Sequence, residues 1–126
     1  METIKSFTSL EQSKVLAKIL PIVSADMHYS KDFDGSWFVD LAEYTSVEIP
    51  KYVGDVEEHL LPCWSLAALL DILPYPQLSK DNLGSGRIGW MVSAYPDNCR
   101  YDSCWHDNPI DACIEMIEKL NEQKLL

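Results

Sequence analysis

The stretch Leu61–Pro74, LPCWSLAALLDILP, has the most regular apolar pattern in the chain and decides how the fold is interpreted. Its leucines recur at the spacing of one helical face, at Leu66, Leu69, Leu70 and Leu73. Ser65 is placed to cap this helix, and Pro74 is placed to end it. Because a helix of about two turns is not stable alone in water, the stripe predicts a core contact. The alternative is a helix that docks into a partner's groove.

A second helix is predicted before this stretch, over residues 8–20. Its start has the spacing of a capping box, which pairs a hydroxyl residue with Glu or Gln three positions later. Ser9 with Gln12 and Thr8 with Glu11 both satisfy that spacing. Leucine and isoleucine side chains then recur along one face.

A third helix is predicted over residues 108–126, with Asn108 as the N-cap and Pro109 in the first helical position. Its buried stripe is expected at Ile110, Cys113, Ile117 and Leu120. Its water-facing side is expected at Glu115, Glu118 and Glu122.

Alternating side chains and turn residues predict two β-hairpins. The first joins residues 24–30 to 36–41 through a turn at Gly35, and the second joins residues 87–95 to 99–106. The intervening chain is interpreted as irregular connections, at residues 42–62 and 74–86.

The predicted order is therefore helix, hairpin, helix, hairpin, helix. We expect an α+β fold in which the two hairpins join into one antiparallel sheet, a single layer covered by helices. The length of 126 residues fits one globular domain over residues 1–126.

The charge distribution argues against direct nucleic-acid binding. The net charge is −10, and eight of the 20 acids lie between Asp32 and Glu58, beside the single base Lys51. The ten Lys and Arg residues are scattered, whereas phosphate binding needs clustered cations. The acids form either a solvated surface or an acidic face that engages a basic partner and imitates DNA.

The sequence shows no membrane span and no secretory signal, because no apolar run approaches about 18 residues. Four cysteines without an export signal favour free thiols in a reducing compartment. We therefore expect a cytoplasmic protein.

Three segments carry a resemblance: SADMHY at residues 24–29, PCWSLAALLDILP at residues 62–74 and NPIDACIEMIEKLNEQKLL at residues 108–126. Together they resemble a set of small uncharacterised proteins of gut-bacterial phages, prophages and mobile elements. The resemblance covers most of the chain, but its motifs are caps, apolar stripes and a tryptophan. It implies a genomic context in which small acidic proteins modulate host machinery, and no activity.

Metal binding is one hypothesis for the segment CRYDSCWHD, residues 99–107. Cys99, Cys104 and His106 offer soft and borderline ligands, and the two cysteines are separated as in some structural zinc sites. The segment lacks the paired knuckles of known sites, so the competing interpretation is unrelated thiols and no cofactor.

Two catalytic hypotheses are weaker. Cys104 with His106 could form a nucleophile and base, but two positions apart on a strand their reactive atoms are poorly aligned. Asp26 and His28, with Asp40 on the partner strand, could form an acid/base pair, or the polar outer face of a hairpin.

Aromatic and anion-binding side chains supply the remaining binding candidates. Trp90 is expected on one sheet face, and Trp105 is expected to share a face with Tyr101. Such a row marks either core or a partner surface. Arg87 follows the glycine-rich NLGSG and could hold an anion, although these glycines lead into a strand rather than a helix.

The sequence thus leaves the function unknown and ranks three classes. The first is a non-enzymatic interaction protein that binds another protein. The second is a small-ligand or nucleotide binder, working as a homo-oligomer with a pocket at its interface. The third is a metal-dependent hydrolase, which no sequence signature supports.

Overall fold

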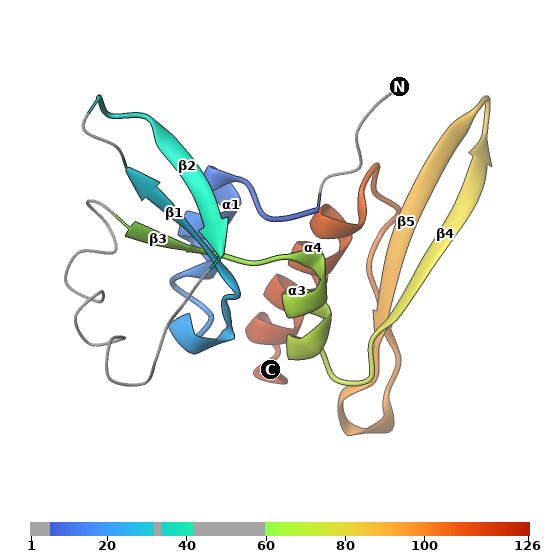
Figure 1. Cartoon of the computed structure of the whole chain (residues 1–126). Coiled ribbons are helices and arrows are strands. Elements are labelled where there is room, and N and C mark those ends of the chain that lie inside the picture. The colour runs from blue at the N-terminus through green and yellow to red at the C-terminus, as the bar shows by residue number, and fades with distance from the viewer. Residues whose placement is uncertain (1–5, 32–33, 42–59) are drawn as a thin grey trace. The chain divides into compact units, whose positions relative to one another are not determined.

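The computed structural model of the chain describes residues 6–31, 34–41 and 60–126 (Figure 1). It contains both helices and antiparallel sheets, which confirms the predicted α+β class. The described elements are α1 (Leu10–Leu16), the 3₁₀ turn η1 (Ile22–Ser24), β1 (Met27–Lys31), β2 (Trp37–Leu41), β3 (Leu60–Cys63), α3 (Leu66–Ile72), β4 (Gln77–Gly84), β5 (Arg87–Ala94), the 3₁₀ turn η2 (Pro96–Asn98), β6 (Tyr101–Asp102) and α4 (Pro109–Glu122).

Two compact units make up the described chain, Phe7–Ala68 and Leu69–Leu126. Each unit has its own three-stranded sheet. One globular domain over residues 1–126 stays a prediction.

The sheet of the first unit has the order β2-β1-β3. β1 pairs antiparallel with β2, which places Tyr29 opposite Val39 and confirms the first predicted hairpin. β3 pairs with the other edge of β1, with Leu61 opposite Tyr29. Residues 60–62 were predicted to be part of an irregular connection. That prediction was wrong, because they belong to β3. Pro62 weakens the strand signal, yet an edge strand tolerates a proline because its outer side needs no N–H donor.

The rest of that predicted connection, residues 42–59, lies outside the described residues.

α1 begins with the capping box predicted from Ser9 and Gln12. The Ser9 hydroxyl accepts the Gln12 N–H at 3.2 Å, and the Gln12 side-chain oxygen accepts the Ser9 N–H at 3.0 Å. The helix ends at Leu16, earlier than the predicted boundary at residue 20. Leu16 and Leu20 are both buried, so the apolar pattern continues through the turn after the helix.

A buried polar cluster links the two ends of the first unit. Thr8 is fully buried, and its hydroxyl bonds to the Ser13 hydroxyl at 2.8 Å and accepts the Trp64 N–H at 3.2 Å. The Thr8 N–H donates to the Trp64 carbonyl at 2.9 Å. The Tyr29 hydroxyl donates to the Thr8 carbonyl at 2.8 Å. Because buried polar groups are costly unless they are bonded, this cluster fixes the chain entering α1 against β3.

The leucine helix α3 has the predicted cap. The Ser65 hydroxyl accepts the Ala68 N–H at 3.2 Å. The Asp26 carboxylate accepts both the Ser65 N–H, at 2.9 Å, and the Ser65 hydroxyl. Leu69 and Leu73 are buried, which confirms the core prediction for these two positions, whereas Leu66 and Leu70 are half-buried.

The sheet of the second unit has the order β4-β5-β6, with β4 and β5 forming a long antiparallel hairpin (Figure 1). The prediction of an irregular connection over residues 74–86 was therefore wrong for residues 77–84, which form β4. Most β4 side chains are exposed on both faces, so the strand has no apolar alternation. It is specified instead by pairing with β5 and by a turn in which Gly84 and Gly86 have φ of +93° and +76°.

The second predicted hairpin is present in shortened form. β6 is two residues long, and Asp102 lies opposite Ser93. A further bridge pairs Trp90 with His106. From Ser93 to Trp90 is three residues, whereas from Asp102 to His106 is four, so the second chain bulges by one residue.

α4 packs against β5 and begins with the predicted cap, because the Asn108 side chain accepts the Asp111 N–H at 2.9 Å. Pro109 occupies the first turn. All four predicted stripe residues are fully buried: Ile110, Cys113, Ile117 and Leu120.

The single sheet predicted from the two hairpins is corrected by the structure. In the described residues the hairpins belong to separate sheets. The physical reason is that each predicted hairpin pairs instead with a strand from a segment interpreted as a connection, since β3 pairs with β1 and β4 pairs with β5. One edge of each predicted hairpin is therefore occupied by a strand of its own unit.

Candidate interaction surface

A small apolar patch lies on the face of the β4–β5 sheet that points away from α4. Val92 and Ala94 face the core and are fully buried, so Gly89 faces the opposite side by strand alternation. A Cβ placed on Gly89 would come within 2.5 Å of Leu83 Cδ1 and 3.2 Å of Trp105 Cε3. Leu83 and Trp105 therefore cover the bare backbone of Gly89. These three residues are called the Gly89 patch.

The apolar side chains of the patch remain open to solvent. The exposed fractions are 39% for Leu83 and 38% for Trp105. Ile88, next to Gly89 and pointing to the other face of the same hairpin, is 41% exposed. The hairpin thus presents large apolar side chains on both faces near its turn.

Charged side chains surround the Gly89 patch. Arg87 lies beside it and pairs with Asp107, with 3.4 Å between the guanidinium and the carboxylate. Asp81 lies directly opposite Gly89 in the register, so its side chain is on the patch face. The Asp81 carboxylate accepts the Asn82 N–H at 2.8 Å. Within the described part of the chain, no cation forms an ion pair with Asp81.

The predicted binding residues fall on two different faces. Trp105 and Arg87 share the patch face. Trp90 lies on the α4 side, where the Lys80 ammonium is 5.1 Å from its ring centroid. Tyr101 lies opposite Ala94 and so is also on the α4 side. The predicted shared face of Trp105 and Tyr101 was wrong because the one-residue bulge after β6 reverses the alternation.

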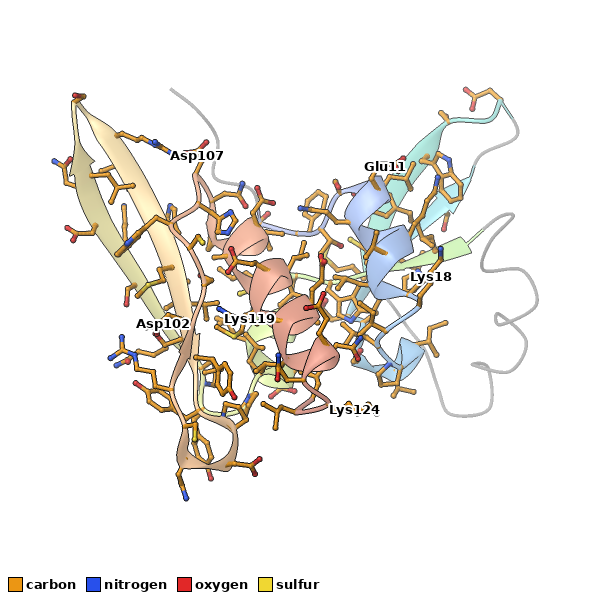
Figure 2. The ribbon with its side chains drawn as sticks, turned by 180° about the vertical axis from the view of Figure 1, so that it is seen from behind. Glu11, Lys18, Asp102, Asp107, Lys119 and Lys124 are labelled. Atoms are coloured by element: carbon orange, nitrogen blue, oxygen red, sulfur yellow. The ribbon has the colours of Figure 1, made fainter. Side chains whose placement is uncertain are left out.

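Glu115 of α4 holds the segment that follows β6. Its carboxylate lies 2.9 Å from His106 Nε2 and accepts the Cys104 N–H at 2.9 Å. One turn further along, Lys119 donates to the Asp102 carbonyl at 3.0 Å. Both residues are labelled in Figure 2. The prediction that Glu115 faces water was wrong, because its side chain is 30% exposed and doubly bonded.

The surroundings of Glu115 set its ionisation. Desolvation raises its pKa, but the hydrogen bonds from His106 and from Cys104 outweigh that effect, so the pKa of Glu115 is lowered from its usual 4.5. A lowered folded-state pKa means that the carboxylate form stabilises the fold. This stabilisation is present above the unfolded pKa and is lost as the pH falls through the folded pKa.

We expect Glu115→Gln to lower the free energy of unfolding by about 1–2 kcal/mol at pH 7, since hydrogen bonds to charged groups are stronger than neutral ones. The difference from wild type should shrink below about pH 4, where the wild-type carboxylate also becomes neutral. Urea unfolding between pH 3 and pH 7 measures this. Glu118→Gln, on the exposed side of the same helix, is the matched control. Parallel pH profiles for Glu115→Gln and wild type would contradict the assignment.

The residues predicted for zinc do not assemble with further ligands in the described structure. Cys99 and Cys104 are exposed free thiols, and His106 is bonded to Glu115. Within the described residues, no group of three or more His, Cys, Asp or Glu side chains is arranged to hold a metal ion. Zinc binding stays a prediction without a structural site.

No described contact supports the catalytic hypothesis for Cys104 and His106. In the described chain no hydrogen bond joins the Cys104 thiol to His106. Asp26 is bonded to Ser65 as part of the α3 cap. His28 lies opposite Asp40 in the strand register.

Cys113 lies in the buried stripe of α4. Its burial raises the pKa of the Cys113 thiol to about 12.

Sequence reasoning identified Trp105 and Arg87 but missed Leu83, Gly89 and Glu115. A usable signal was present, because glycines on both sides of Ser85 between two strand-length runs are typical of a hairpin turn. That turn would have placed Leu83 opposite the start of β5. Glu115 carried no such signal, since its partner comes from a separate element.

No protein-family model matches the chain, and no curated protein and no solved structure matches it. In the part of the chain that the structure describes, no helix has both the length and the apolar character to cross a membrane.

Proposed function

We propose that the chain is a non-enzymatic interaction protein that binds another protein through the Gly89 patch. The observation that carries the proposal is the pairing of a bare glycine with two exposed apolar side chains, Leu83 and Trp105, on a sheet face that α4 does not cover. Tryptophan is enriched among the residues that dominate binding energy at protein interfaces. Clustered apolar side chains on a surface are typical of partner sites.

The patch geometry also supports a shape-specific contact. Because Gly89 has no side chain, Leu83 and Trp105 both lie close to the strand backbone at one position, and a partner would meet them together there. The Arg87–Asp107 pair beside them supplies a polar rim, as is usual around an apolar interface centre.

The cellular setting is part of the same proposal. All four cysteines are free thiols, which supports a reducing compartment and hence the cytoplasm. The resemblance to proteins of phages and mobile elements supports a partner among the host's proteins, whose activity the chain modulates.

The test compares partner capture by immobilised wild-type chain and by variants of the patch. Leu83→Ser and Trp105→Ser each remove one apolar side chain, and Gly89→Ala displaces both by adding one carbon. We expect each variant to weaken retention of the wild-type partner at least about tenfold, the effect of losing an interface hot spot. Quantitative mass spectrometry of the retained proteins measures the change.

The matched control is Val23→Ser, which removes a side chain that is 64% exposed in the first unit. It should retain the partner as wild type does. Circular dichroism checks that every variant is folded. Equal retention by wild type and all three patch variants would overturn the proposal.

A further inference from the structure

We propose that the segment docking on the Gly89 patch is basic, with an apolar side chain flanked by lysine or arginine. This inference rests on the proposed function and names the chemistry of the partner. The charges around the patch, the indole of Trp105 and the charge of the whole chain support a basic partner.

The arginines on the outer face of the second sheet already have anionic neighbours. Arg87 pairs with Asp107, and Arg100 pairs with Asp102 at 2.8 Å. Asp81, directly across from Gly89, forms no ion pair within the described residues. A partner cation that approaches the patch therefore meets an unneutralised carboxylate.

Trp105 and Asp107 both offer contacts to a cation of the partner. An exposed indole attracts lysine and arginine through its electron-rich face. The Asp107 side chain is 78% exposed, and its 3.4 Å contact with Arg87 is a weak surface pair that a partner arginine can share. One exposed indole and two carboxylates, those of Asp81 and Asp107, thus belong to the same part of the hairpin surface.

The whole chain is acidic. Its net charge of −10 attracts a basic partner over long range and repels anionic ones. A second copy would bring a further −10 to the same surface. Nucleic acid would bring phosphates to a face whose arginines are already paired. A basic protein segment is the occupant that these charges favour.

The experiment titrates the full chain with three synthetic peptides of equal length. One alternates leucine with lysine, one replaces every lysine by glutamate, and one replaces every leucine by serine. We expect the leucine–lysine peptide to bind at least about tenfold more tightly than either of the others, since it alone offers both contacts. Isothermal titration calorimetry measures the three affinities.

Two variants locate the binding. Asp81→Asn removes the carboxylate opposite Gly89, and Asp97→Asn removes another exposed charge in η2, at the other end of β5. Asparagine suits Asp97, whose φ is +52°. We expect Asp81→Asn to weaken the leucine–lysine peptide about three- to tenfold, and Asp97→Asn to change it less than twofold. Equal effects of the two variants would mean attraction by net charge alone and would overturn the inference.

Other outcomes separate this inference from the proposed function. Tighter binding of the glutamate peptide would overturn the basic partner, while loss of captured protein in Trp105→Ser would still support protein binding through the patch. Sedimentation that shows a dimer dissociated by Trp105→Ser would identify a second copy as the occupant and overturn the inference. Capture that survives all three patch variants would overturn the proposed function itself.

Discussion

Replacing Trp64 by alanine is expected to lower the free energy of unfolding by about 3–5 kcal/mol, the usual cost of deleting a buried aromatic side chain. Trp64 is fully buried and follows β3 directly. Its indole N–H donates to the Ser24 hydroxyl at 2.9 Å, and its backbone bonds to Thr8 in both directions. The side chain therefore fills the space where η1, β3 and the start of α1 meet.

Trp64→Phe separates the packing of the ring from its hydrogen bond. Phenylalanine keeps an aromatic ring but loses the donor to Ser24, so we expect a smaller loss of about 1–2 kcal/mol. Urea unfolding followed by far-ultraviolet circular dichroism measures both variants without relying on Trp64 fluorescence. A loss below about 1 kcal/mol for Trp64→Ala would show that the ring is not part of the core.

The second large effect is expected at Ile117 in α4. Ile117→Ala should lower the free energy of unfolding by about 2–5 kcal/mol, because it removes three carbons from a fully buried position. The neighbouring Glu118 points outward, and Glu118→Ala should change stability by less than about 0.5 kcal/mol. The two variants occupy neighbouring positions in the third turn of one helix and both end in alanine, but they remove side-chain atoms from a buried and an exposed face.

Thermal unfolding measured by calorimetry compares the two variants. Similar midpoints for Ile117→Ala and Glu118→Ala would contradict the assignment of the buried stripe. Such a result would also remove the reason for placing the Gly89 patch on the outer face, since α4 then would not cover the inner one.

The sequence predicted some residues of the candidate site, but not how these residues are arranged. Trp105 and Arg87 were predicted because a tryptophan in a strand and an arginine after a glycine turn are visible in the sequence. The sequence did not predict that Trp105 and Arg87 lie on the same sheet face. A one-residue bulge between β5 and the segment after β6 reverses the alternation of side chains there. The bulge depends on hydrogen bonds to another strand, which no local pattern specifies.

Glu115 shows the same limit on α4. The sequence places it two positions from both Cys113 and Ile117 of the apolar stripe, away from that face of the helix, which predicts a solvated carboxylate. The segment after β6 brings His106 and the Cys104 amide to it, and the carboxylate becomes their acceptor. The partner residues are nine and eleven positions away in the chain and reach Glu115 only because β6 pairs with β5.

The sequence by itself determined where the helices begin and how they are capped, because capping boxes, N-terminal prolines and apolar periodicity act within a few residues. The Ser9–Gln12 box, the Ser65 cap and the Asn108 cap are all present where these patterns predict them. Only the tertiary structure decided that the hairpins form two sheets and that Trp105 meets Leu83 over Gly89. These features depend on pairing between distant segments, where the energy comes from partners that the local sequence does not contain.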